Sequence, residues 1–196
     1  MKKIFCLTIM LLAIFQTLVF AGNVDNKESL IKHWDWKRMN PVCIYAGKQA
    51  DIFISGMDYR NNLEQQFGKA NVEVPDMKFW GNDEFFIVRR KDTQDSGHIN
   101  GVGSTTAVKT EQSVKWKTPA GVYVGMPYTE AQKIYGLPED YAKETFCVVS
   151  PDHTKYLMIY RHFESDTEGI YRVGGIEVYG RITPIISNSL KRRYNK

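Results

Sequence analysis

The 196-residue sequence contains only four histidines and three cysteines, and none of them forms a recognisable site. The histidines are scattered and include no pair at the spacing of a helical zinc site. The chain also lacks a Gly-x-Ser-x-Gly sequence, which would expose a hydrolase nucleophile, and a Walker-type phosphate loop. We therefore expect no metal ligand, no cofactor and no catalytic residue set.

Charge of one sign is also scarce, because 26 Lys and Arg stand against 22 Asp and Glu. Removal of the first 21 residues, which carry two lysines, would reduce the net charge from +4 to 24 − 22 = +2. Nucleic-acid binding requires a dense basic footprint, so we expect no nucleic-acid partner. Most of the excess lies in the tail at 186–196, which is either a solvated end or a contact for anionic lipid or wall polymer.

The sequence has one long apolar run, over residues 4–20, which follows two lysines and ends before Ala21. Basic, apolar and small segments in this order predict a signal peptide that is cleaved after residue 21. Gln16 and Thr17 interrupt the run, which is shorter than the roughly 20 apolar residues of a spanning helix. The alternative is an uncleaved anchor. We expect an exported protein of 196 − 21 = 175 residues, periplasmic, cell-surface or secreted, with no further transmembrane segment.

Cleavage at this position would leave two cysteines, Cys43 and Cys147. An even pair in an exported chain is typical of a disulfide. The alternative is that each thiol is simply a small buried apolar group.

Hydrophobic periodicity predicts an α+β protein with more strand than helix. Helices are expected over 27–39, 56–68 and 127–136. Strands are expected over 42–45, 51–54, 72–80, 84–90, 101–114 with a glycine-rich loop at 101–106, 121–124, 145–149, 155–162 and 169–181. The acidic stretch around 166–169 and the pair Gly174-Gly175 are interpreted as hairpin turns.

Two of the predicted helical passages resemble each other. The first begins with Gly56-Met57 and ends with Phe67-Gly68, and the second begins with Gly125-Met126 and ends with Tyr135-Gly136. The outer glycines are 68 − 56 = 12 and 136 − 125 = 11 positions apart. Each passage follows a short predicted strand and precedes several others, so the sequence predicts an internal repeat.

The second passage resembles a signature of exported bacterial proteins with the β-lactamase-inhibitor-protein-like fold, which the SmpA/OmlA-type outer-membrane assembly lipoproteins share. The likeness is carried by residues 118–138, in which a strand runs into Gly-Met and a helix ends in aromatic-Gly-x-Pro. It implies helices on one face of an antiparallel sheet, in two tandem units, with the other face open for protein binding. The chain lacks the lipid-attachment cysteine of the lipoproteins and the two-disulfide pattern of the inhibitors.

The expected organisation has five parts. They are a signal peptide at 1–21, an N-terminal helix and lead-in strand at 22–50, a first α/β repeat at 51–116, a second repeat at 117–185 and a basic tail at 186–196.

The open sheet face is the expected working surface of a non-enzymatic module that binds a protein or an envelope polymer. Tyr156, Tyr160 and His162 share one side of a predicted strand, and Tyr171 or Tyr179 would extend the same aromatic face. Tyrosine is favoured at protein interfaces. Ordinary sheet packing would explain the same pattern. An exported hydrolase that acts on cell-wall or glycan substrate, with a site assembled from distant residues, is the alternative function.

Overall fold

The computed structural model describes residues 27–35, 42–45, 52–57, 63–91, 98–138, 144–151 and 155–179. The expected signal peptide at 1–21 and the basic tail at 186–196 lie outside these residues. No helix within the described ranges is long and apolar enough to cross a membrane.

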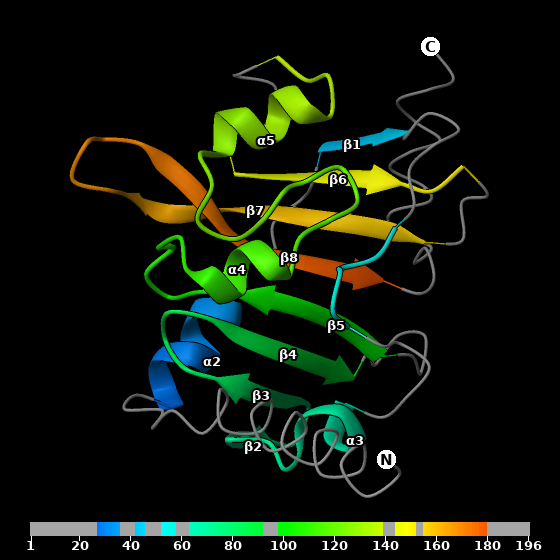
Figure 1. The fold of residues 1–196 in the computed structure, drawn as a ribbon, viewed down its shortest axis with the longest axis vertical. Helices are drawn as coiled ribbons and strands as arrows, with labels where there is room; N and C mark the ends of the chain where they lie inside the picture. The colour runs from blue at the N-terminus through cyan, green and yellow to red at the C-terminus, as the bar shows by residue number, and fades with distance from the viewer. Residues whose placement is uncertain are drawn as a thin grey trace, which may run out of the picture.

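An eight-stranded sheet forms the framework of the molecule (Figure 1), which confirms the α+β class. The strands are β1 (Val42–Tyr45), β2 (Val72–Val74), β3 (Met77–Gly81), β4 (Phe86–Lys91), β5 (His98–Gly103), β6 (Thr145–Val149), β7 (Tyr156–Ser165) and β8 (Tyr171–Tyr179). Their order in the sheet is β1-β6-β7-β8-β5-β4-β3-β2. The pair β1–β6 is parallel and the other pairs are antiparallel.

Four short helices accompany the sheet in the described ranges: α2 (Lys27–Asp35), α3 (Leu63–Phe67), α4 (Glu111–Lys115) and α5 (Tyr128–Ile134). Helix α4 begins with a capping box, in which Thr110 accepts from the Ser113 amide and Ser113 accepts from the Thr110 amide. Helices α4 and α5 lie in front of the sheet in Figure 1, whereas α2 lies behind it.

Alternating side chains divide the core into two layers, one on each face of the sheet. Ile87 in β4 belongs to the larger layer, whereas its neighbours Phe86 and Val88 belong to the opposite one. The larger layer also receives Leu63 from α3 and Tyr128 from α5. Both faces of the sheet are therefore apolar, and each needs a cover.

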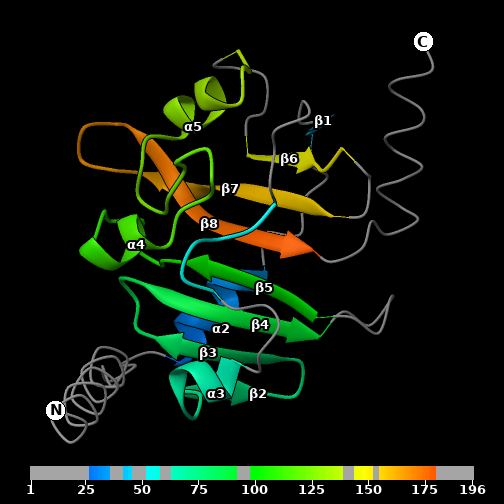
Figure 2. The same cartoon turned by 45° about the vertical axis from the view of Figure 1, so that its right-hand side comes forward.

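Helix α2 covers part of the second face, seen from another side in Figure 2. Its Leu30 and Trp34 are buried against Phe79 and Phe86 of the sheet. The expectation that the helices share one sheet face is therefore wrong for α2. The strands that it covers are apolar on both sides, so a one-sided helical layer would leave this face in water.

Two glycines in β5 make room for the helix. A Cβ atom on Gly101 would lie 2.9 Å from the Trp34 ring, and a Cβ atom on Gly103 would lie 2.9 Å from that ring and 2.7 Å from the Phe86 ring. Trp34 in turn packs edge-on against Phe86, with ring centroids 5.7 Å apart. The glycine-rich stretch expected as a loop is thus in part the end of strand β5. Because Gly101 and Gly103 lack side chains, the Trp34 indole can pack directly against the strand.

Most predicted elements are confirmed, but the strand expected over 101–114 ends at Gly103 and is followed by helix α4, and the helix expected over 56–68 appears only as α3, with residues 56–57 outside it. Three further segments differ. Residues 52–54 are not a strand, although Ile52 and Ile54 are buried and Phe53 is exposed. This segment crosses in front of the sheet (Figure 1), where burial alternates as it does in a strand but without a ladder of hydrogen bonds. Residues 121–124 are likewise irregular. The Gly174-Gly175 pair is not a turn but lies inside β8, where the register with β7 shifts.

Gly103→Ala is expected to lower the free energy of unfolding by about 1–3 kcal/mol, because the added methyl group overlaps the Trp34 and Phe86 rings. In a Trp34→Ala background the methyl group has space on one side, so the same change should cost less. Urea unfolding of the four proteins in this double-mutant cycle measures the difference. Strictly additive losses in the free energy of unfolding would contradict the packing of Trp34 against Gly103.

Candidate binding surface

Four of the five predicted binding residues lie inside the protein. The exposed fraction is 0% for Tyr156, 3% for Tyr160, 6% for His162 and 9% for Tyr179. Tyr171 alone among the five is exposed, at 41%. The expectation of an open aromatic face is therefore wrong for these four side chains, and alternation along the strand identified their common face but not its cover.

A buried carboxylate explains the position of two of these tyrosines. Glu177 in β8 is 2% exposed and accepts hydrogen bonds from the hydroxyls of Tyr160 and Tyr179, the latter at 2.6 Å. Arg90 of β4 donates from Nη2 to the Tyr179 hydroxyl at 2.9 Å and lies 3.5 Å from Glu177 Oε1. Tyr156 stacks on Tyr179, with ring centroids 4.2 Å apart.

This cluster provides hydrogen-bond partners for a buried carboxyl group inside the sheet. Hydrogen bonds and an opposite charge are what a buried carboxylate requires. Burial raises the pKa of the Tyr160 and Tyr179 hydroxyls well above the usual range, and the Glu177 charge raises both further. Glu177 and Arg90 were missed at the level of sequence, because charged residues on strands usually face solvent and 177 − 90 = 87 positions separate the two.

His162 has a structural role as well. Its Nε2 lies 2.8 Å from the Thr105 carbonyl, and its Nδ1 lies within hydrogen-bonding distance of the Glu164 backbone. With the proton on Nε2, the ring donates to Thr105 and accepts from the Glu164 amide at 3.3 Å. Thr105 is itself held by Asp83, so His162 ties β7 to the loop after β5.

Beyond Tyr160 the β7–β8 hairpin extends past the paired part of the sheet, and we call residues 161–172 the arm. The last paired residue of β5 faces Gly175, and β6 pairs with β7 no further than Tyr160, apart from one bond from the Arg161 amide to the Glu144 carbonyl. The arm therefore extends past both neighbouring strands, as the long orange hairpin in Figure 1 shows.

The arm has a well-defined tip. Asp166 Oδ1 accepts from the Glu168 and Ile170 amides at 2.9 Å each, and its Oδ2 receives Arg172 Nε at 2.7 Å. This confirms the hairpin turn expected around 166–169. The Arg161 guanidinium lies 3.9 Å from the centroid of the Tyr171 ring. Such contacts hold the tip in one shape.

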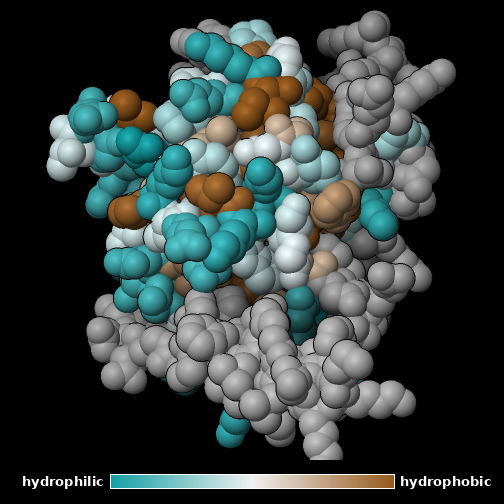
Figure 3. Space-filling view, in the orientation of Figure 1, coloured by the Kyte–Doolittle hydropathy of each residue, from teal (hydrophilic) through white to brown (hydrophobic). Residues whose placement is uncertain are grey.

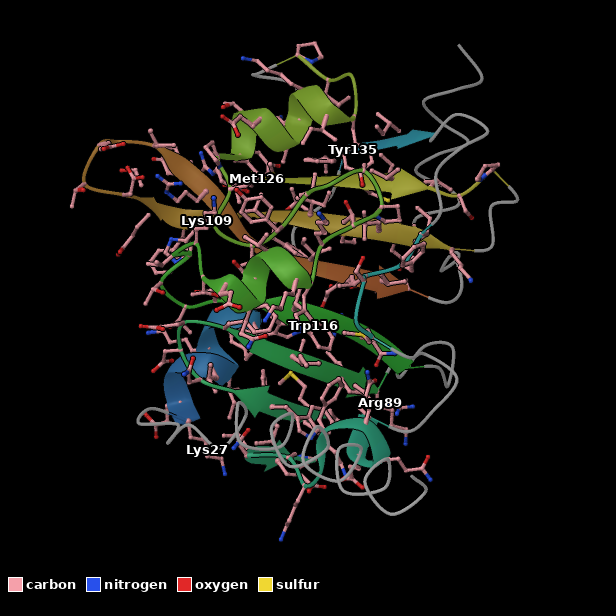
Figure 4. The ribbon with its side chains drawn as sticks, viewed as in Figure 1. Lys27, Arg89, Lys109, Trp116, Met126 and Tyr135 are labelled. Carbon is pink, nitrogen blue, oxygen red and sulfur yellow. The ribbon has the colours of Figure 1, made fainter. Side chains whose placement is uncertain are left out.

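The base of the arm is fastened to the Gly125-Met126 turn. Val173 forms two backbone hydrogen bonds with this turn: its carbonyl accepts from the Gly125 amide at 2.8 Å, and its amide donates to the Met126 carbonyl at 2.9 Å. Gly125 has φ +93°, and a Cβ atom there would lie 2.6 Å from the Lys109 amide nitrogen. Figure 4 shows Lys109 and Met126 beside this junction.

Exposed apolar side chains gather on the arm. The described residues hold six large apolar side chains that are exposed, and three of them, Phe163 at 49%, Ile170 at 36% and Tyr171 at 41%, fall within nine positions. Brown patches on the hairpin in Figure 3 stand among hydrophilic residues. Glu164 and Glu168 are exposed in the same segment.

The two cysteines, 147 − 43 = 104 positions apart, are direct neighbours in the sheet. They are Cα partners in the parallel pair β1–β6, both are buried, and both are present as thiols. The disulfide stays a prediction.

No group of three or more His, Cys, Asp or Glu side chains suited to a metal ion occurs in the part of the chain that the structure describes. Comparisons with protein-family models, curated proteins and solved structures give no match.

Tyr160→Phe is expected to lower the free energy of unfolding at pH 7 by about 1–3 kcal/mol, because buried Glu177 loses a donor. A tyrosine whose folded pKa is raised contributes stability below the unfolded pKa, about 10, and loses it as the pH rises toward the folded pKa. The wild-type protein should therefore lose stability above pH 10 more steeply than the variant does.

Urea unfolding between pH 7 and pH 11 measures both effects, with the exposed Tyr171→Phe as the matched control. Equal slopes for wild type and Tyr160→Phe, or an equal loss in the control, would rule out the buried Tyr160–Glu177 interaction.

Proposed function

We propose that this protein is an exported, non-enzymatic binding module that captures a protein partner with its arm. The proposal retains the protein-binding role expected from the sequence but moves the contact from the sheet face to the β7–β8 hairpin. Of the tyrosines first considered, Tyr171 stays a contact residue. Tyr156, Tyr160 and Tyr179 support the sheet instead.

The observation that carries the proposal is the exposed apolar group on a preorganised projection. Phe163, Ile170 and Tyr171 stand in water on a hairpin whose turn is fixed by Asp166 and Arg172. A rigid segment loses little conformational entropy on binding, and aromatic anchors supply most of the energy of protein interfaces. A contiguous exposed apolar patch with a polar rim is typical of an interaction site.

The charged residues of the arm indicate which charges the partner would carry at the edge of its binding site. Asp166 is neutralised by Arg172, at 2.7 Å, and Arg161 lies over the Tyr171 ring. Glu164 and Glu168 remain exposed to solvent. The complementary surface is an apolar recess with lysine or arginine at its edge.

We also propose that the chain consists of two tandem units of the β-lactamase-inhibitor-protein-like type. Gly56 and Gly125 both have positive φ, at +83° and +93°, and the methionine after each is buried in the same core layer. Gly68 and Gly136, which end the two passages, also have positive φ. These matched conformations support a duplication, because each requires glycine for the same backbone reason.

The direct test replaces Phe163 or Tyr171 by a photo-crosslinking amino acid in the organism of origin. Ile134 serves as the matched control, since it is an apolar side chain that is 42% exposed on α5 and is not part of the arm. One protein should crosslink from both arm positions and not from Ile134. With that partner purified, Phe163→Ser and Tyr171→Ser should each weaken binding about tenfold or more.

Two further measurements separate contact from folding. The serine variants should unfold within about 1 kcal/mol of the wild type, because both side chains are largely exposed and Tyr171 loses only its contact with Arg161. Glu164→Lys with Glu168→Lys should weaken binding most at low salt. Equal crosslinking from Ile134, or unchanged affinity in the serine variants, would refute capture by the arm.

A further inference from the structure

The edge strand β1 is attached to the sheet in a way that differs from the other strands. It has four residues, it pairs with β6 alone among the described strands, and this pair is the parallel one in the sheet. Cys43 is its most deeply buried residue with a described side chain, and the strand partner of Cys43 is Cys147.

The geometry of this pair suits a covalent bond. Register partners on neighbouring strands have Cα atoms about 4.8 Å apart, within the range of about 4.4–6.8 Å that disulfides span. Both side chains lie in the same buried cluster, so they point to the same face of the sheet. The two thiols also lie within hydrogen-bonding reach of each other.

We infer that Cys43 and Cys147 are an oxidation site, at which a disulfide fastens β1 to β6 in the exported protein. The Cys43 and Cys147 thiols together lose two protons and two electrons as the S–S bond forms. The electrons pass to a disulfide-bearing oxidant, which becomes a dithiol. The inference rests on the proposed export, since oxidising conditions are found outside the cytoplasm, but not on the proposed binding by the arm.

Burial determines when this bond can form. Cys147 is fully buried and Cys43 is 5% exposed, so an oxidant cannot reach the sulfur atoms in the folded sheet. Burial also raises the pKa of the Cys147 thiol and leaves little of the reactive thiolate. Oxidation therefore belongs to folding, before or while β1 docks, and the closed bond is afterwards shielded from reductants.

The bond protects an apolar sheet edge. All five residues of β6, Thr145–Val149, are buried, and β1 is the strand that covers their outer side. If β1 left the sheet, β6 would become an uncovered edge with apolar side chains on both faces, which favours pairing with another chain. The disulfide closes a loop of more than 100 residues and so opposes this departure.

The test uses the full chain with Cys6→Ser, so that Cys43 and Cys147 are its only thiols. It is refolded in a mixture of reduced and oxidised glutathione. The expected product is a monomer lighter by two hydrogens, with a proteolytic fragment that joins the two cysteines. Its thermal midpoint should lie about 10 °C above that of the same chain refolded in excess reductant.

Two controls complete the experiment. A chain that also carries Cys43→Ser should give no internal disulfide and no difference between the two refolding conditions. Dithiothreitol should reduce the disulfide between Cys43 and Cys147 slowly in buffer and rapidly in urea, because only unfolding exposes the sulfur atoms.

Mixed disulfides with glutathione, disulfide-linked dimers or an unchanged thermal midpoint would each overturn the inference. Protein isolated from the organism of origin should carry the same bond. If the chain oxidises readily on refolding but the protein from the organism contains free thiols at these positions, both the native disulfide and the proposed export are overturned. Crosslinking from Phe163 would still decide the binding role of the arm separately.

Discussion

The antiparallel pairing of β5 with β8 is the constraint on which the rest of the structure depends. Among the described strands it is the one connection between β2–β5 and the set β1, β6, β7 and β8. Gly103 faces Gly175 across this seam, and the missing Cβ atoms of Gly101 and Gly103 leave room for Trp34 on the second face. The side chain of Glu177 lies on that face, where Arg90 from β4 and Tyr160 from β7 reach it from either side. The packing site of Trp34 and the hydrogen-bonded cluster around Glu177 therefore both lie where the two sets of strands join.

Much of this architecture follows from local patterns in the sequence. Alternating apolar residues located β6, β7 and β8, and the positive-φ glycines at 68 and 136 end the helices as expected. Local patterns failed where burial came from a distant segment. Residues 52–54 alternate because they cross the core layer, and α4 was not recognised because its five residues are too few for helical periodicity.

The binding surface shows the same division between local and distant information. A strand pattern places Tyr156 and Tyr160 on one face, but it cannot tell whether that face meets water or another part of the chain. Their burial depends on contacts such as Tyr160 with Trp34, whose ring centroids lie 6.3 Å apart across more than 120 positions. Tyr171 differs because β8 has no β5 partner at that end, and this follows from strand lengths that emerge only on folding.

The arm also determines how the molecule carries mechanical load. A force applied to the tip would act along β7 and β8, whose hydrogen bonds to β6 and β5 run across the direction of the force. The force is then shared by all of these bonds as shear, instead of opening them one after another as in a zipper. A sheet loaded in this way resists a force that would separate a strand pulled away at its side.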